Sequence, residues 1–481
     1  MMSKEELIDY IRSKQRETRV LSERYEKNIK NKRIYYHKIE KHLDNFIEEN
    51  GEYYQRLIMM PGLRGVGKTT MLYQFYSHLT KEKNISEDDI FFLDVHELKT
   101  VHNGDIKEIY DLYLESIQHS TPATLDKKVF LFVDEAQFDK NWANYAKLLY
   151  DKSINIFMIF TGSSAITFDI NTDATRRMKR EQIFPCSFNE YLLLKHDLKL
   201  SENNFKDLIL KGDTDSIKKA IECETVIKNE LIKLDNDPEI ELKKFIHAYG
   251  FPFALNLDET EIHRQTNDII ERIVNYDLKQ FNSFNVSDES VMQLIAYLTT
   301  KKPGQTSKNS IAQALNLNIR TVINILSALE KSQLIFSINA YGSAGKMLKK
   351  PSEHFFLTPS LKSAQNYRVG RYDLNHEKCY SVLAENLVAS IINRLSYETQ
   401  QSLCLFYDSN KKGVDFVVKH LDKIIPIEVG IGKKTKSQLT IAKNKYNSDY
   451  GILISNRTSK IKYENGILYI PLSTFALIIG N

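Results

Sequence analysis

Between Gln55 and Phe184, short apolar runs alternate with longer stretches whose apolar residues recur at helical spacing. Runs that are apolar throughout are typical of parallel strands buried on both faces and joined by crossover helices. The pattern therefore predicts an α/β domain built on a nucleotide-binding type of sheet. The five expected strands are Arg56–Met60, Ile90–Asp94, Lys128–Val133, Asn155–Thr161 and Gln182–Phe184.

The pattern changes three more times along the chain. Residues 187–257 follow mostly helical spacing, which indicates a helical lid. From Asp288 to Phe356, two helical segments, a short turn and the alternating stretch Gln333–Asn339 follow in the order of a winged helix-turn-helix. The helix expected at Tyr380–Leu395 precedes a last α/β module, with apolar runs at Leu403–Tyr407, Val414–Val418, Ile424–Val429 and Gly451–Ser455.

These changes predict five segments. They are a basic helical segment at 1–50, a P-loop core at 51–190, a helical lid at 191–285, a winged helix at 286–372 and a nuclease-like module at 373–481. Between Ile11 and Lys38 the chain has ten Lys or Arg residues and three acidic ones. That charge run indicates either a solvated helical face or arm, or a surface for a polyanion.

Composition narrows the class of protein. Hydrophobic residues are 42% and charged residues 27% of the 481, the balance of a soluble globular chain. We expect no membrane span, and the charged first residues lack a secretory signal, so the expected location is the cytoplasm. The four cysteines are widely separated, which disfavours zinc sites and disulfides. A net charge of +4 does not by itself imply a nucleic-acid partner.

The segment Gly62 to Thr69 matches the phosphate-binding pattern GxxxxGK[ST], after a strand and before a helix. Glycines let consecutive backbone N–H groups face phosphate oxygens, and the helix adds the positive end of its dipole. We expect Lys68 to reach the β and γ phosphates and the Thr69 hydroxyl to bind Mg²⁺. The predicted nucleotide-binding residues are Gly62, Arg64, Gly65, Val66, Gly67, Lys68, Thr69 and Thr70.

Two adjacent carboxylates, Asp134 and Glu135, end the predicted strand Lys128–Val133. The carboxyl end of a parallel strand lies beside the phosphates, so Asp134 is expected to hold the Mg²⁺ shell. Glu135 is expected to orient or deprotonate the attacking water. The alternative is a slow nucleotide switch in which Glu135 is a solvated strand-end residue.

Polar residues also follow the next strand. Thr161 or Ser163 is the candidate sensor of the γ-phosphate, although hydroxyl residues are also ordinary turn formers. Arg176 or Arg177 could act as an arginine finger, in cis or across a subunit interface. A surface basic pair explains the two arginines equally well.

The chain resembles the archaeal and bacterial AAA+ ATPases that carry a winged helix and a C-terminal PD-(D/E)XK nuclease-like domain of unknown function. The resemblance covers most of the chain. It is carried, in the order of that family, by Leu63 to Thr70, Phe132 to Gln137, Phe160 to Ser164, Phe184 to Leu192, Tyr249 to Pro252, Glu385-Asn386, Gly413 to Phe416 and Pro426 to Val429. It implies an α/β fold class with a parallel P-loop sheet and helical lid, then a winged helix and the nuclease-like domain.

In the expected winged helix, Ile319 to Ser332 is the second helix, with Arg320, Asn324 and Lys331 at polar positions. Such a helix can enter a major groove, with Lys346, Lys349 and Lys350 touching the backbone. DNA is therefore the expected partner. Winged helices also serve as packing or protein-contact modules, and few arginines lie on this face.

In the last module the resemblance makes Glu385, Asp415 and Glu428 the carboxylates that would share a divalent metal, with Asp415 and Glu428 as the central pair. The family pattern has Glu-x-Lys, whereas this chain has Gly430 where the lysine is expected. Lys433 or Lys434 could substitute. The departure favours a degenerate docking domain over an active nuclease.

The leading interpretation is an Mg-dependent ATPase that couples nucleotide state to DNA binding. One alternative is an ATP-controlled, metal-dependent nuclease. Another is a signalling or scaffold ATPase directed at protein. The motifs leave the oligomeric state open, from monomer to homo-oligomer.

Overall fold

The computed structural model describes residues 3–49, 54–102, 104–163, 172–281, 284–302, 307–371, 376–410, 412–431 and 437–479. It divides into two compact units, Met1–Phe184 and Pro185–Asn481. Among these residues, no helix combines the length and the apolar character needed to cross a bilayer.

The first unit is a five-stranded parallel sheet in the order β2-β3-β4-β1-β5. The α/β class predicted from the apolar runs is confirmed, and the first four strands along the chain begin and end within one residue of the predicted bounds. The strands are β1 (Leu57–Pro61), β2 (Ile90–Asp94), β3 (Val129–Asp134), β4 (Ile156–Gly162) and β5 (Lys179–Arg180). The side chains of β1 to β4 are almost all buried in a core of Leu, Ile, Val, Met and aromatic residues.

The predicted fifth strand was wrong in position. The structure places β5 at Lys179–Arg180, beside Ile58 and Met59, whereas Gln182–Phe184 contributes only a single bridge between Ile183 and Gly62. Lys179 and Arg180 are exposed and polar, so this edge strand has no apolar run by which a sequence pattern could find it.

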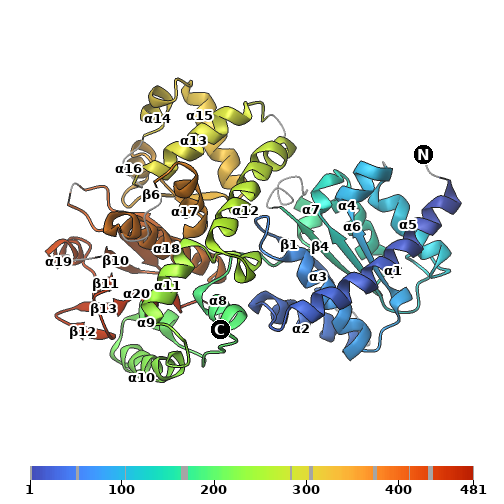
Figure 1. Cartoon of the computed structure of the whole chain (residues 1–481), viewed down its shortest axis with the longest axis horizontal. Helices are drawn as coiled ribbons and strands as arrows, with labels where there is room; N and C mark the ends of the chain where they lie inside the picture. The colour runs from blue at the N-terminus through green and yellow to red at the C-terminus, as the bar shows by residue number, and fades with distance from the viewer. Residues whose placement is uncertain are drawn as a thin grey trace. The chain divides into compact units, whose positions relative to one another are not determined.

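Helices pack against the sheet as Figure 1 shows. Helix α1 lies along α3, α5 and β2, and Tyr25 of α1 stacks on Tyr73 of α3, which stacks in turn on Phe92 of β2. The basic N-terminal segment is therefore an integral part of this unit. The helices are α1 (Lys4–Asn28), α2 (Ile34–Glu48), α3 (Lys68–Ser77), α4 (Val95–Glu97), α5 (Ile106–Ser116), α6 (Trp142–Lys152) and α7 (Thr172–Thr175).

The second unit begins with helices, as predicted for residues 187–257. Between Asp288 and Lys331 the structure has three helices, one more than predicted, and the antiparallel pair of β6 with β7 then follows at the predicted alternating stretch. The helices up to that pair are α8 (Phe188–His196), α9 (Phe205–Lys211), α10 (Thr214–Leu231), α11 (Pro238–His247), α12 (Glu259–Arg272), α13 (Asp288–Thr300), α14 (Lys308–Ala314) and α15 (Ile319–Lys331).

One eight-stranded mixed sheet runs through the rest of this unit, in the order β12-β13-β11-β10-β9-β8-β6-β7. Its strands are β6 (Ile335–Ala340), β7 (Glu353–Phe356), β8 (Leu403–Tyr407), β9 (Phe416–His420), β10 (Lys423–Gly430), β11 (Gly451–Ser455), β12 (Lys462–Glu464) and β13 (Ile467–Pro471). The helices among them are α16 (Ala344–Lys349), α17 (Pro359–Arg368), α18 (Glu377–Glu398), α19 (Ser437–Lys445) and α20 (Leu472–Ala476).

A buried carboxylate joins the first helices of the second unit. Glu241 of α11 accepts hydrogen bonds from the Tyr191 hydroxyl (2.7 Å), the Asn236 amide (2.7 Å) and the Lys244 ammonium (2.8 Å). His196 Nε2 lies 3.1 Å from the same carboxylate. Burial opposes ionisation of Glu241, but the hydrogen bonds from Lys244, Tyr191 and Asn236 outweigh it and lower its pKa to about 2.

Glu241→Gln should destabilise the second unit by about 2–4 kcal/mol at pH 7, because the new amide N–H group of the buried side chain would face the donors Tyr191, Asn236 and Lys244. A depressed pKa gives stability that is complete above the ordinary value of 4.5 and is lost as the pH falls towards 2. Urea unfolding followed by circular dichroism should therefore show the gap between wild type and variant narrowing below pH 4.5. The exposed Glu222→Gln serves as the control, and an equal effect of both substitutions would contradict this role for Glu241.

Candidate nucleotide site

The loop between β1 and α3 has the backbone conformation that its glycines permit. Gly65 and Gly67 have φ of 84° and 89°, a region that residues with a Cβ rarely adopt. Gly62 is needed for a different reason, because a Cβ there would lie 2.5 Å from the carbonyl oxygen of Ile183. The chain therefore turns tightly at the carboxyl edge of the sheet and enters α3 directly.

Helix α3 begins at Lys68, so Lys68, Thr69 and Thr70 form its first turn, and the positive end of the helix dipole faces the loop. The buried Lys68 ammonium donates to the carbonyl oxygens of Gly62 (2.9 Å) and Leu63 (3.2 Å). It is thus held inside the curve of the loop. Val66 is buried and Arg64 is partly exposed.

Arg33, which precedes α2, supports the loop from behind. Its buried guanidinium donates to the carbonyl oxygen of Val66 (2.6 Å) and to that of Phe184 (3.0 Å). Sequence reasoning missed Arg33 because it is one of ten basic residues in a charge run. Only the fold shows that this one points inward.

Asp134 at the end of β3 joins three elements. The Thr69 hydroxyl donates to its Oδ2 (2.6 Å), and the Thr161 hydroxyl at the end of β4 donates to its Oδ1. Burial and the neighbouring charge of Glu135 raise the pKa of Asp134, although the hydrogen bonds from Thr161 and Thr69 act in the opposite direction. The structure thus brings the predicted residues Thr69, Asp134 and Thr161 together.

Glu135 follows in the left-handed backbone region, with φ of 53° and ψ of 42°. Such a conformation is uncommon for a residue with a side chain and is concentrated at functional sites. Its carboxylate accepts a hydrogen bond from the Gln137 amide. Gln137 is therefore a positioning residue that sets the orientation of Glu135.

Asp94 is a third carboxylate at this edge, and sequence reasoning missed it. It ends β2, where it pairs in register with Asp134. Burial raises its pKa, and the charges of Glu135 and Glu97 add to that effect. The signal was present in the sequence, since Asp94 ends an apolar run as Asp134 does.

These residues fit a divalent cation with a polyphosphate. Three partly or fully buried carboxylates lie together; burial is the main cause of the raised pKa of Asp94 and of Asp134, and the charge of Glu135 adds to it, which a cation would offset. Hydroxyl and carboxylate oxygens are the ligands that Mg²⁺ prefers, and Thr69 and Asp134 offer them in contact. The loop amides and Lys68 supply the complementary positive side.

The structure also describes the remaining candidates, Ser163, Arg176 and Arg177. Ser163 is buried one residue beyond β4. Arg177 forms an ion pair with Asp151 of α6, with 2.6 Å between Nε and Oδ1, and Arg176 is exposed. The structure thus gives Arg177 a partner on its own chain.

In the second unit, Glu428 lies on β10, and Asp415 comes directly before the adjacent strand β9 rather than on a strand as predicted. The Asp415 N–H donates to Glu428 (3.3 Å), and the Val429 N–H donates to Asp415 (2.8 Å). Burial and the charges of Glu385 and Asp415 raise the pKa of Glu353 on β7 to about 8. Glu353 is therefore a fourth carboxyl group that sequence reasoning missed, because it comes from another segment.

Lys362 of α17 does not take the place of the lysine that the nuclease pattern expects. The buried Lys362 ammonium donates to the carbonyl oxygens of Leu298 (3.1 Å) and Lys301 (3.2 Å) at the end of α13. Gly430 is buried at the end of β10. Lys433 and Lys434 lie outside the described residues, as does the side chain of Lys346.

Three family models match parts of the chain. The model of an AAA domain matches residues 54–192, which include the loop, Asp134 and Thr161. Two domains of unknown function match the second unit, DUF8612 at residues 240–367 and DUF4143 at residues 381–475.

Two curated relatives come from Methanocaldococcus jannaschii. The chain is 32% identical over 477 residues to the uncharacterised protein MJ1637, which covers 98% of this chain and 94% of that protein. It is 23% identical over 370 residues to the uncharacterised protein MJ1544, covering 74% of this chain and 70% of that one.

Solved structures resemble the chain only distantly. AMPPCP-bound DnaA from Aquifex aeolicus is 16% identical, with a TM-score of 0.23 over 61% of this chain and 86% of that one. Cdc6p from Pyrobaculum aerophilum is 11% identical, with a TM-score of 0.27 over 69% of this chain and 92% of that one. Scores this low decide nothing about function.

Arg33→Met should weaken ATP binding about tenfold. Loss of a charge-assisted hydrogen bond to the loop should destabilise the loop conformation that binds ATP by about 1.5 kcal/mol. Titration with a fluorescent ATP analogue measures the dissociation constant. Arg12→Met, on the exposed face of α1, is the matched control and should leave it unchanged. Wild-type affinity in a folded Arg33→Met protein would show that the loop needs no support from Arg33.

Proposed function

The chain belongs to the same family as the uncharacterised protein MJ1637 and contains an AAA domain, and from this premise we propose that it binds ATP with Mg²⁺ and hydrolyses it. The contact of Thr69 with Asp134, beside the loop that holds Lys68, is the observation that carries the proposal. It joins the phosphate-binding side of the site to the acidic side.

Binding follows from the two sides of the site. The loop amides and the Lys68 ammonium neutralise the β and γ phosphates, and Lys68 exchanges its carbonyl partners for phosphate oxygens. Thr69 and Asp134 would hold Mg²⁺, which when bound neutralises charge that develops on the phosphate oxygens. Thr161 keeps the Asp134 carboxylate oriented through its hydroxyl.

Hydrolysis needs a positioned water. Its oxygen forms a bond to the γ-phosphorus while the bond from that phosphorus to the β–γ bridging oxygen breaks, which leaves ADP and phosphate. Glu135 accepts the proton that the water loses. The Gln137 amide holds the Glu135 carboxylate, so it positions the base without touching the substrate.

We expect ATP turnover by the wild type with Mg²⁺, and a loss of at least 100-fold in Glu135→Gln with ATP binding retained. Lys68→Ala should lose binding as well as turnover, because it removes the charge that meets the phosphates. Phosphate release and analogue binding are the two measurements. Glu108→Gln, an exposed carboxylate on α5, is the control.

The two readouts separate the possible failures. Binding without turnover in the wild type would contradict hydrolysis by Glu135 and favour a slow nucleotide switch. Turnover that persists in Lys68→Ala would place the activity in another protein of the preparation. Retained wild-type turnover in Glu135→Gln would remove Glu135 from the chemistry.

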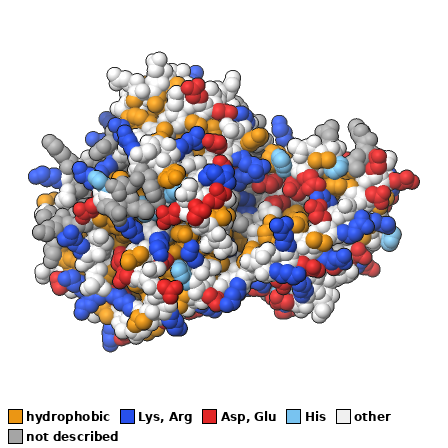
Figure 2. Space-filling view, in the orientation of Figure 1, with side chains coloured by type: hydrophobic (Ala, Val, Ile, Leu, Met, Phe, Trp, Pro, Cys, Tyr) orange, Lys and Arg blue, Asp and Glu red, His pale blue; other side chains and the backbone are white. Residues whose placement is uncertain are grey.

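A second proposal concerns the target of the ATPase. On α15, Arg320 and Asn324 are exposed, as recognition of DNA by this helix requires. Ile319 and Ile323 on the same helix are 47% and 41% exposed, which suits contact with an apolar surface as well. Basic side chains on the face shown in Figure 2 are interspersed with acidic and neutral ones. We propose DNA as the partner, with a protein surface as the alternative.

The last module supports docking better than cleavage. Asp415 accepts a backbone hydrogen bond within its own sheet, and Gly430 replaces the expected lysine. The pair Asp415 and Glu428 could still share a divalent ion, as a nuclease would require. We therefore keep an ATP-controlled nuclease as the second candidate.

Fluorescence anisotropy with a labelled DNA duplex should show an affinity that falls as the salt concentration rises from 50 to 200 mM, because binding releases counterions from the DNA. Arg320→Ala should weaken it and reduce the salt slope by about one, whereas the exposed Lys218→Ala should not. The same samples with Mn²⁺ should leave the DNA intact. Cleavage that disappears in Asp415→Asn would establish the nuclease, and no binding at 50 mM salt would favour a protein partner.

A further inference from the structure

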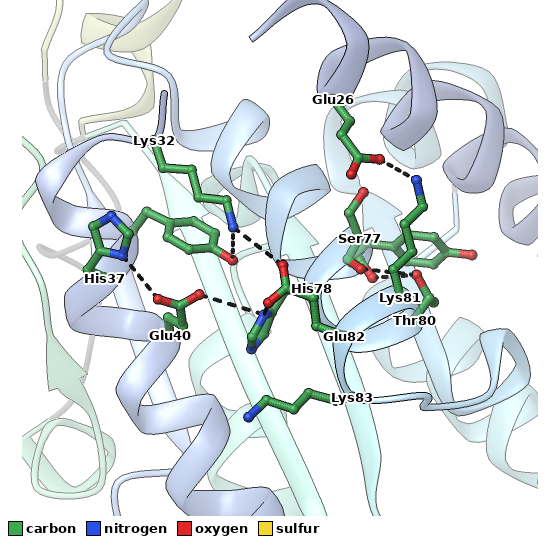
Figure 3. Close-up of polar contacts among 12 residues, drawn as sticks. Glu26, Lys32, His37, Glu40, Ser77, His78, Thr80, Lys81, Glu82 and Lys83 are labelled. Carbon is green, nitrogen blue, oxygen red and sulfur yellow. Dashed lines mark hydrogen bonds and ion pairs between the residues drawn. The ribbon is translucent and has the colours of Figure 1, made fainter. Parts of the chain in front are cut away.

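A cluster of side chains of types that bind metal ions lies in the first unit and includes none of the candidate nucleotide-binding residues (Figure 3). Glu40 comes from the middle of α2, and His78 and Glu82 are the first and last residues of the π-helical turn that continues α3. Each of the three offers one ligand atom, and these atoms lie within 4.8 Å of one another.

The separations match those between the ligands of a small tetrahedral ion. His78 Nδ1 lies 3.0 Å from Glu82 Oε2 and 3.6 Å from Glu40 Oε1. Zn²⁺ is bound by nitrogen and oxygen at about 2.0–2.1 Å, which sets ligand atoms about 3.3 Å apart in a tetrahedron. An ion could therefore sit among the three atoms with small shifts of the side chains.

The other nitrogen of the imidazole is also engaged. His78 Nε2 lies 2.8 Å from Asp44 Oδ1, one turn further along α2. A carboxylate on the far nitrogen of a metal-binding histidine holds the proton there and leaves the near nitrogen free to bind the ion. Asp44 would thus fix the tautomer and the orientation of the ring.

Exposure is graded across the cluster. The His78 side chain is 3% exposed, Glu40 is 22% exposed and Glu82 is 59% exposed. The histidine is therefore held rigidly from inside, whereas solvent reaches the site past Glu82. That leaves an entry path for an ion and room for water as a fourth ligand.

The charged groups around the cluster leave it with a net negative charge. Lys32 lies 3.8 Å from Glu82, and Lys83 lies 3.0 Å from Asp44, so each lysine faces one of the three carboxylates. Glu40 faces His78 and, at 3.0 Å, Nδ1 of His37. The three carboxylates Glu40, Asp44 and Glu82 and the two lysines together leave one negative charge, which a bound cation would offset.

We propose that Glu40, His78 and Glu82 bind a divalent transition-metal ion, with Zn²⁺ as the best match. An imidazole ligand disfavours Mg²⁺ and Ca²⁺, which prefer oxygen alone, and two carboxylates with one imidazole suit Zn²⁺. The ion would join α2 to the end of α3. Arg33, directly before α2, contacts the phosphate-binding loop, and α3 begins at Lys68 of that loop. An ion that joins the two helices would therefore make the loop more rigid.

The test is a Zn²⁺ titration of the full chain after removal of metals with a chelator, in competition with a chromophoric chelator and without nucleotide. We expect one ion per chain in the wild type. Glu82→Gln and His78→Gln should weaken binding at least 100-fold, and Asp44→Asn about 10–100-fold. Glu26→Gln, an exposed carboxylate that pairs with Lys81, is the control and should change nothing.

Two further variants make the result specific. Lys32→Gln should bind Zn²⁺ at least as tightly as the wild type, because a positive charge near Glu82 is removed. Lys68→Ala should bind it equally, so loss of the ATPase and loss of this site are independent results. The wild type, Glu26→Gln, Lys32→Gln and Lys68→Ala should also gain thermal stability when Zn²⁺ is added, whereas His78→Gln and Glu82→Gln should not.

No Zn²⁺ binding by the folded wild type would overturn the proposal and leave the cluster as a set of polar contacts that joins α2 to the end of α3. Binding that survives in both His78→Gln and Glu82→Gln would also overturn it and move the ion elsewhere, for example to a cysteine. Because Glu82 is largely exposed, Glu82→Gln keeps the test valid even where His78→Gln fails to fold.

Discussion

The buried carboxylate of Asp134 is the group on which the nucleotide site depends. A carboxylate out of water is costly unless hydrogen bonds compensate it, and here the hydroxyls of Thr69 and Thr161 do so from two different elements. The same two contacts bind the start of α3 and the end of β4 to β3. Folding of the sheet therefore assembles the acidic side of the site and the phosphate-binding loop in one step.

The loop itself is held by contacts from outside its motif. Gly62 passes against the carbonyl oxygen of Ile183, and Arg33 holds the carbonyl oxygens of Val66 and Phe184. The buried Lys14 ammonium, paired with Glu17 and Glu97 at 2.6 Å, attaches α1 in a similar way. Part of the N-terminal basic run is thus structural, which lowers the charge available there for a polyanion.

In the second unit, pairing between β6 and β8 has a mechanical consequence. Asn339 pairs with Phe406 and Ala340 with Tyr407, so the hairpin of β6 and β7 extends the sheet formed by β8 to β13. A hinge between these segments would break that ladder. Any response of the second unit to nucleotide is therefore expected to move this sheet as one body.

The sequence alone determined what local chemistry dictates. The apolar runs located β1 to β4, because strands buried on both faces must be apolar throughout, and the glycine and lysine spacing located the loop. Asp134 and Glu135 followed from their place at a strand end. Only the tertiary structure decided the other features, because each depends on contacts between residues that are distant in the sequence. It placed β5 at Lys179–Arg180, turned Arg33 inward, brought Glu353 beside other carboxylates, and gathered Glu40, Asp44, His78 and Glu82 from two helical segments.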